Sequence, residues 1–468
     1  MIIEQVRTTD KQTRPWRLPA AVACVSAVVF LLARPHLVDD TFITLAYARN
    51  LAFHGHWGLL ADATSNSATS PANVLALAAL TFVVRDAVVA AGVLYVLCQV
   101  ALVLALRRLG TALPRWFPVL AFAALTVNPL LLSSIGLEVA LGAAVLAWLA
   151  VFAAERRPLA FGLTAGALAL VRLDLLIFAV VLGFSLRSGR ALLGAALVAL
   201  PWFAFSWVVL GAAVPDTFVI KTLQGAQRTW GDWTFANGPL FYARTSPWTA
   251  ALSFLPLLAV PFAFRRSPAL RPFALLALGG AVYHFAYVLL TVPPYHWYYG
   301  PGITTATIFA CAWLSGRLAT GVVLAVVGAS VIAYAAPGLP REFAPLTSNY
   351  ASTAKYAEIG RDLHALAGSR VVGSAGEIGV LAYTCGCAIV DVFADRGLLP
   401  AAIDARGAGD RWVRAALRVD YAFFDFDVRP RRPDLVLRRL PSPPPDALAH
   451  WTLDAPTLGK QELYLVPS

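Results

Sequence analysis

Long runs of apolar residues, separated by short polar segments, cover most of this chain. Runs of about 20 apolar residues are long enough to cross a bilayer as helices. They predict spans at about 17–34, 87–106, 116–133, 137–154, 190–210, 248–264, 272–291, 301–316 and 318–337. A short, interrupted pair at about 159–171 and 175–185 brings the expected total to about 11 spans. The segment 71–84 is shorter and begins at a proline, so we expect a helix lying at the membrane interface.

Composition agrees with this pattern. The chain is 59% hydrophobic and only 13% charged, and its mean hydropathy is +0.69. These values indicate a polytopic α-helical membrane protein. Arginine far outnumbers lysine, a usage that points weakly toward an actinobacterium.

The distribution of charge predicts the orientation. Basic residues concentrate in 1–17, 107–115, 155–157, 187–190, 265–271 and 317. If 71–84 is not counted as a span, all of these segments fall on the same, inner side of the membrane. Because cytoplasmic loops carry the Lys and Arg excess, we expect a cytoplasmic N-terminus in a bacterial plasma membrane and an extracytoplasmic loop at 35–86. The same rule accounts for the net charge of +11, so we expect no nucleic-acid partner.

The pattern changes after residue 337. Long apolar runs stop in 338–468, and turn signals alternate with short apolar segments. We expect a helix over Lys355–Leu366, strands over 370–374, 388–392 and 421–424, and a loop at 441–445. The chain therefore divides into a membrane domain, 1–337, and a small extracytoplasmic α/β domain, 338–468.

The five cysteines fall into two groups. Cys24, Cys98 and Cys311 lie in predicted spans, where a buried thiol behaves as a small hydrophobe. Cys385 and Cys387 lie outside the membrane, where disulfides form, so we expect either free thiols or a strained bridge between these close neighbours and no metal site.

Unusual polar residues of the membrane half gather at its predicted outer face. Asp39 and Asp40 stand side by side after the first span, where charges are costly to place and suggest chemistry. The residues that share this face are Arg49, His54, His56 and Trp57 in the first loop, then Glu138, the pair Arg172 and Asp174, Lys221, and His296 with Tyr298 and Tyr299.

Such a set suits a sugar carried on a lipid phosphate. A carboxylate can take the proton of an acceptor hydroxyl, and cations can neutralise the phosphate that leaves. Adjacent helical residues point about 100° apart, so one aspartate is expected to act as the base while the other positions it or a divalent ion. Alternatives stay open: Glu138 as a helix cap, Arg172 with Asp174 as a structural ion pair, Lys221 as a loop charge, and the 296–299 aromatics as an interfacial belt. His54 and His56 have no clear third partner for a metal.

The order of motifs resembles the GT-C integral-membrane glycosyltransferases that use polyprenyl-phosphate sugars. Asp39 to Asn50, including Tyr47, matches an Asp-Asp-x-[FY]-Ile-x-x-x-Tyr-Ala-x-Asn pattern, and Gly55–Gly58 and Thr69–Pro71 resemble the stretches that follow it. Ile135–Glu138 and Val171–Asp174 are similar to two later turns, although Leu173 replaces a proline. Residues 376–391 resemble the outer domain of actinobacterial arabinofuranosyltransferases.

The resemblance implies transfer of a sugar from a polyprenyl-phosphate donor, with decaprenyl-type lipids among the candidates, to an envelope glycan, glycolipid or glycoprotein outside the membrane. Arabinofuranose is the favoured sugar and mannose the next. The candidate residues for binding the donor phosphate or the substrate are Tyr47, Arg49, Glu138, Arg172, Asp174, Lys221, His296, Tyr298 and Tyr299. His54, His56 and Trp57 are expected either to face the acceptor or to be loop residues. A transporter would show internal repeats, which we do not find, and a non-catalytic scaffold would tolerate loss of both aspartates.

Overall fold

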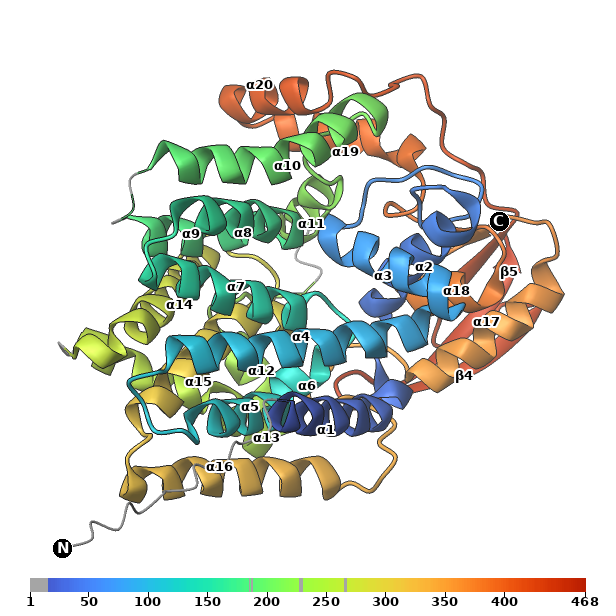
Figure 1. The fold of residues 1–468 in the computed structure, drawn as a ribbon. Helices are drawn as coiled ribbons and strands as arrows, with labels where there is room; N and C mark the ends of the chain where they lie inside the picture. The colour runs from blue at the N-terminus through green and yellow to red at the C-terminus, as the bar shows by residue number, and fades with distance from the viewer. Residues whose placement is uncertain (1–15, 185, 187, 227–229, 265–266) are drawn as a thin grey trace, which may run out of the picture.

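The computed structural model describes residues 16–184, 186, 188–226, 230–264 and 267–468. Parts of the basic segments used to predict orientation, namely 1–15, Arg187, Arg265 and Arg266, lie outside the described residues. Helices dominate up to residue 337, and a mixed region of helices and strands follows (Figure 1).

The membrane half, as we name residues 16–337, is built from helices whose ends are set by local sequence. They are α1 (Arg17–Ala33), α2 (Asp39–His54), α3 (Pro71–Val84), α4 (Ala87–Leu109), α5 (Phe117–Val127), α6 (Pro129–Ser133), α7 (Val139–Ala154), α8 (Pro158–Val171), α9 (Leu176–Gly183), α10 (Gly189–Val209), α11 (Thr217–Ala226), α12 (Gly238–Thr245), α13 (Pro247–Phe254), α14 (Arg271–Leu289), α15 (Gly300–Trp313) and α16 (Arg317–Ala335). Proline stands at the first turn of α3 and α8, where its missing N–H costs nothing, and the Asp86 side chain caps α4.

Within the described residues, five helical segments are long and apolar enough to cross a membrane, which makes this a multi-pass membrane protein. They are Arg17–His36, Ala87–Leu109, Gly189–Val209, Pro247–Phe264 and Pro268–Leu289. The other predicted spans correspond to shorter apolar helices. The stretch 116–133 is split at Asn128, whose side chain accepts hydrogen bonds from the N–H groups of Leu130 and Leu131 and so starts α6.

The C-terminal region, residues 338–468, combines helices with a five-stranded sheet of order β2-β1-β3-β5-β4. Its elements are α17 (Thr353–Ala367), β1 (Val372–Gly373), α18 (Gly379–Cys385), β2 (Ile389–Val390), α19 (Leu399–Gly407), α20 (Arg411–Asp420), β3 (Leu435–Arg439), β4 (Ala449–Ala455) and β5 (Gly459–Pro467). The strand β1 runs parallel to β2 and β3, whereas β5 is antiparallel to β3 and β4.

The predicted strand at 421–424 is wrong. Tyr421 is the C-cap of α20, and a turn follows it. Tyr421 and Phe424 are buried while Ala422 and Phe423 are exposed, so the buried aromatic residues are three apart, as on a helical turn, and not two apart as on a strand.

The C-terminal region packs directly on the segment 35–86. One continuous hydrophobic core contains Phe42 and Leu45 of α2 together with Ile359 of α17, Leu381 of α18 and Leu435 of β3. Figure 1 shows the sheet and α17 on the side of the molecule where α2, α3 and α18 meet. Residue 338 therefore marks a change in secondary structure and no gap in packing.

Close contact between α18 and α2 generates a prediction. A Cβ atom on Gly379 would lie 2.0 Å from the backbone oxygen of Asp39, so Gly379→Ala must push the two helices apart. We expect the free energy of unfolding to fall by about 1–3 kcal/mol, the usual range for overpacking. The measurement is the apparent melting temperature of the purified protein.

Gly321→Ala provides the matched control. Gly321 lies inside α16, and a Cβ atom added there would meet nothing within 4 Å, so alanine should be neutral or stabilising. Equal melting temperatures for the two variants would show that α18 is not held against α2.

Candidate active site

Asp39 and Asp40 open α2, where the helix N-terminus favours negative charge. They face different partners. Asp39 is 3% exposed, and its two carboxylate oxygens accept hydrogen bonds from the backbone N–H groups of Gly379 and Val380, each at 2.8 Å. Asp40 keeps 35% of its side chain exposed and lies 3.7 Å from Nζ of Lys221. Asp39 therefore holds the C-terminal region, and Asp40 faces a cation.

Lys221 lies in a group of aromatic rings. Its Nζ is 4.4 Å from the ring centre of Tyr295, 5.3 Å from that of Trp297 and 5.5 Å from that of Tyr298. Burial alone would lower the pKa of Lys221, but Tyr298, Asp40 and Tyr295 outweigh it and raise the pKa above its ordinary value. The ammonium group is thus held charged beside a single carboxylate.

Arg172 is the centre of a second polar cluster, at the break between α8 and α9. Its guanidinium donates to Asp174 at 2.6 Å, to Glu138 at 3.2 Å and to the hydroxyl oxygen of Tyr287 at 2.6 Å. Tyr283 also donates to Asp174, at 3.1 Å. Two carboxylates thus offset the arginine charge within the protein, as expected for a buried ion pair.

Tyr298 connects the two clusters. Its ring lies 4.9 Å from Cζ of Arg172 and 5.5 Å from Nζ of Lys221. A continuous line of contacts therefore runs from Asp40 through Lys221 and Tyr298 to Arg172 and on to Glu138 and Asp174. Six of the residues singled out from the sequence are brought together in this way.

The other singled-out residues of the first loop have partners elsewhere. The Tyr47 hydroxyl bonds to Ser65 at 2.6 Å and Ser67 at 2.9 Å. Arg49 donates to the backbone oxygen of Tyr383 at 3.0 Å and stacks on its ring. The Trp57 ring lies between those of Tyr47 and Trp202.

The remaining residues singled out from the sequence are the histidines and Tyr299. His54 is exposed and His56 half-buried. Among the described residues, no group of three or more His, Cys, Asp or Glu side chains is arranged to hold a metal ion. His296 is fully buried with Nε2 3.1 Å from the oxygen of Ser133, and the Tyr299 hydroxyl donates to the oxygen of Phe235 at 2.6 Å.

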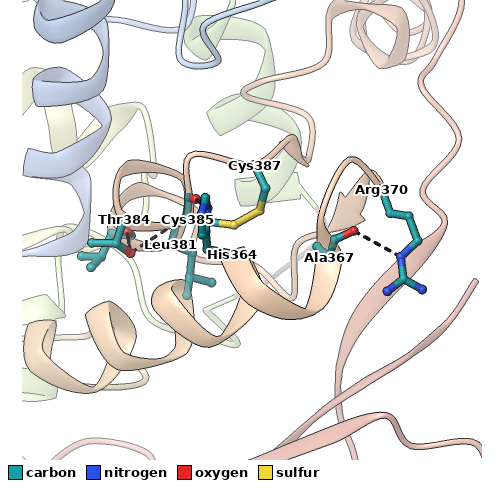
Figure 2. The surroundings of a disulfide bond; sticks show 8 residues. His364, Ala367, Arg370, Leu381, Thr384, Cys385 and Cys387 are labelled. Carbon is teal, nitrogen blue, oxygen red and sulfur yellow. Dashed lines mark hydrogen bonds between the residues drawn. A yellow bond between two sulfur atoms is a disulfide. The ribbon is translucent and has the colours of Figure 1, made fainter.

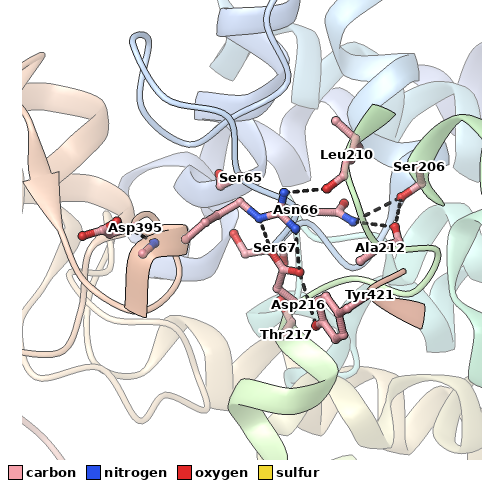
Figure 3. Close-up of polar contacts among 12 residues, drawn as sticks. Ser65, Asn66, Ser67, Ser206, Leu210, Ala212, Asp216, Thr217, Asp395 and Tyr421 are labelled. Atoms are coloured by element: carbon pink, nitrogen blue, oxygen red, sulfur yellow. Dashed lines mark hydrogen bonds and ion pairs between the residues drawn. The ribbon is translucent and has the colours of Figure 1, made fainter. Parts of the chain in front are cut away.

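A junction at Asp216 positions the helix that carries Lys221. Asp216 directly precedes α11 and pairs with Arg396 at 3.0 Å, and Tyr421 donates to it at 3.4 Å (Figure 3). The backbone N–H of Asp216 donates to the oxygen of Asn66 at 2.9 Å. The segment 35–86, α11 and the C-terminal region are therefore tied together at the start of α11, the helix that carries Lys221.

Cys385 and Cys387 form a disulfide at the far end of α18 (Figure 2). Of the two expected alternatives, the structure shows the bridge. The other three cysteines are free: Cys98 and Cys311 are buried, but Cys24 is exposed on α1, contrary to the expectation of burial. Nδ1 of His364, on α17, lies 2.7 Å from the backbone oxygen of Cys385. This hydrogen bond joins α17 to the end of α18.

Sequence reasoning missed several residues of the site. Tyr283 and Tyr287 stand four apart in the apolar helix α14, and this spacing on one helix face was the available signal. Tyr295 and Trp297 lie in an aromatic segment that the sequence did mark, although neither was singled out. Arg396 carries no local signal because its partner lies far away in the chain, and Gly379 lies in the 376–391 segment that the sequence marked, although its contact with Asp39 was not predicted.

Comparison with solved structures identifies the fold. The crystal structure of ArnT from Cupriavidus metallidurans bound to undecaprenyl phosphate aligns with a TM-score of 0.55 at 15% identity, covering 96% of this chain and 97% of that one. The mycobacterial arabinofuranosyltransferase AftD aligns over 97% of this chain and 40% of its own, with a TM-score of 0.47 and 15% identity. The predicted GT-C fold is therefore confirmed. No family model and no curated protein sequence matches the chain.

The buried Asp39 and the half-buried Glu377 and Asp391 near it generate a pH prediction. Burial and the charge of Asp40 raise the pKa of Asp39 to about 6, although the hydrogen bonds from the N–H groups of α18 act to lower it. Burial raises the pKa of Asp391 to about 7. Burial and the charge of Asp39 also raise the pKa of Glu377 well above its ordinary value. These groups bind protons more tightly when folded, so their contribution to stability is complete below about pH 4 and is lost as the pH rises to about 7.

Asp391→Asn tests this dependence. The N–H groups of Phe393 and Ala394 both donate hydrogen bonds to Oδ1 of Asp391. The side-chain oxygen of asparagine can accept the same two hydrogen bonds without carrying a charge. We expect the variant to melt several degrees higher than the parent above pH 7, and the gain to vanish toward pH 4. The exposed Asp404→Asn is the control. A gain that does not change with pH would contradict the assignment.

Proposed function

We propose that this protein transfers a sugar from a polyprenyl-phosphate donor to a hydroxyl group of an acceptor outside the membrane. The observation that carries the proposal is the Asp40–Lys221 pair, which places one half-buried carboxylate and one charged amine at the same point among aromatic rings. The fold shared with ArnT, whose structure holds undecaprenyl phosphate, supports the lipid carrier.

Asp40 is the general base in this proposal. Both oxygens of Asp39 are occupied by backbone N–H groups, and 3% exposure leaves it no room for an acceptor. Asp40 is half-buried, and within the described residues its one ion pair is with Lys221 at 3.7 Å, longer than a direct hydrogen bond. A substrate hydroxyl can therefore reach its carboxylate.

The reaction exchanges one C–O bond for another and moves one proton. The acceptor oxygen attacks the anomeric carbon, its proton passes to Asp40, and the bond from that carbon to the phosphate oxygen breaks. The electron pair leaves with polyprenyl phosphate, whose charge Lys221 stabilises. The 3.7 Å between the Asp40 carboxylate and Nζ of Lys221 brings both groups within reach of one anomeric carbon.

Lys221 is a better phosphate ligand than Arg172. Glu138 and Asp174 already offset the charge of Arg172. If Arg172 turned away from them to bind a phosphate, it would leave buried carboxylates unpaired. Arg172 is a positioning residue in our account, because its guanidinium lies on the Tyr298 ring that faces Lys221. The half-buried Tyr295 provides a flat apolar face next to the amine, on which a sugar ring can pack, while the buried Trp297 stacks on Tyr295.

The donor sugar is proposed from the sequence resemblance. The Asp39–Asn50 pattern and residues 376–391 favour arabinofuranose, with mannose next. The distribution of basic residues favours an outward-facing site, where lipid-linked sugars replace nucleotide sugars. Purified protein incubated with a panel of polyprenyl-phosphate sugars would release free polyprenyl phosphate only from its own donor.

Asp40→Asn should lower kcat by about 10²–10⁴-fold, the usual contribution of a general base. The variant keeps the size of the side chain and the packing of α2, so its melting temperature should change little. Asp62→Asn, an exposed carboxylate of the same loop, is the control. Full activity of Asp40→Asn in the matching donor assay would refute the proposed mechanism.

Lys221→Met should raise KM for the donor by roughly 10–100-fold, because a hydrogen bond to a charged group contributes about 1.5–3 kcal/mol. Methionine preserves the apolar contact with the surrounding rings. Lys460→Met, an exposed residue at the start of β5, is the matched control. An unchanged KM would mean that the phosphate binds elsewhere.

A further inference from the structure

The helix α20 (Arg411–Asp420) presents three different faces. Val413 and Leu417 pack inward against a small core that includes Ile403 of α19 and Val219 of α11. Trp412, Ala415, Ala416 and Val419 are exposed, and their i, i+3, i+4, i+7 spacing places them on one apolar stripe. Trp412 is 71% exposed and Val419 65% exposed, which is unusual for a region expected to lie in water.

Basic residues flank this stripe. Arg411 and Arg418 are seven residues apart on one side of α20 and are exposed. Arg414, on the same side, donates hydrogen bonds to the backbone oxygens of Gly407 and Ala408. We therefore do not count Arg414 among the arginines that can bind a partner. An apolar stripe bordered by arginines is the pattern of a helix that lies in the plane of a membrane interface.

The stripe continues into the lipid-facing surface of α10. The indole N–H of Trp207, near the end of α10, donates to the backbone oxygen of Val419 at 2.8 Å, and its ring contacts that of Phe423 at 5.1 Å. Val208 and Val209 beside it are 55% and 63% exposed. In Figure 1, α10 lies between α20 and α8, so α20 is on the side of α10 away from the helix bundle.

We propose that α20 and Phe423 insert into the outer leaflet of the bilayer and anchor the C-terminal region to anionic lipid headgroups through Arg411 and Arg418. Continuity with the exposed apolar face of α10, a candidate membrane span, selects lipid over other partners. The exposed carboxylates Asp425 and Asp427 follow directly, so the chain returns to water after Phe423. This anchoring is independent of the proposed transferase activity.

Photo-crosslinking in vesicles tests the anchor. Trp412 is replaced by p-benzoyl-phenylalanine in the full-length protein, which is reconstituted into vesicles of equal phosphatidylglycerol and phosphatidylcholine, and adducts are identified by mass spectrometry. Leu458, an exposed apolar residue in the β4–β5 turn, carries the same probe as control, and Val419 is a second test position. We expect lipid adducts at positions 412 and 419 far above those at 458.

Lipid adducts at 412 and 419 no higher than at 458, or crosslinks from 412 to a second copy of the chain, would overturn the proposal. The arginines are tested separately. Arg411→Gln with Arg418→Gln should lower the ratio of phosphatidylglycerol to phosphatidylcholine adducts by about fivefold per arginine, the effect of one basic residue near an anionic surface. An unchanged ratio would overturn the assignment of these arginines to anionic headgroups.

Discussion

The contact between Asp39 and the start of α18 is the interaction on which the rest of the site depends. A carboxylate buried at 3% exposure must be hydrogen-bonded, and two backbone N–H groups from the C-terminal region meet this need. The contact joins segments 340 residues apart in the chain. It fixes the start of α2, because Asp39 is the first residue of that helix, and so it determines the direction in which the neighbouring Asp40 points.

A second constraint acts on the lysine. The Asp216–Arg396 pair holds the start of α11 against the C-terminal region, while Tyr295, Trp297 and Tyr298 surround the Lys221 amine. The carboxylate and the amine are thus positioned by different helices but by the same docked region. In our account, the C-terminal region builds the site without donating a catalytic group to it. Anchoring of α20 in the outer leaflet would hold this region at the height of the lipid phosphate.

Local sequence predicted the helices well, because their limits are set by neighbouring residues. The apolar segment 71–84, which begins at a proline, became α3 (Pro71–Val84), and the apolar run at 190–210 became α10 (Gly189–Val209). The hairpin of β4 and β5 was missed, although Trp451, Leu453 and Ala455 alternate with polar residues and are buried as a strand requires. The run of aromatic residues at 421–424 was misread because it looked like a strand while its buried members follow a helical spacing.

The site was harder to predict, because its geometry depends on distant partners. The sequence marked both aspartates but offered no way to rank them, since Gly379 and Val380, which occupy Asp39 through their backbone N–H groups, carry no charge and lie 340 and 341 residues away. It marked Arg172 and Asp174 as a pair, yet Tyr283 and Tyr287 reach them from a helix more than 100 residues later. Asp40, Lys221 and Tyr298 were all singled out, but only the fold places the three within one line of contacts.

The most direct test of the proposed site is an experimental structure of the protein with a polyprenyl phosphate bound. We expect a phosphate oxygen to lie about 2.7–3.2 Å from Nζ of Lys221, with Asp40 beside it and Asp39 still bonded to Gly379 and Val380. A lipid phosphate bound away from Lys221, or an Asp39 carboxylate released from α18 and turned toward the phosphate, would contradict it.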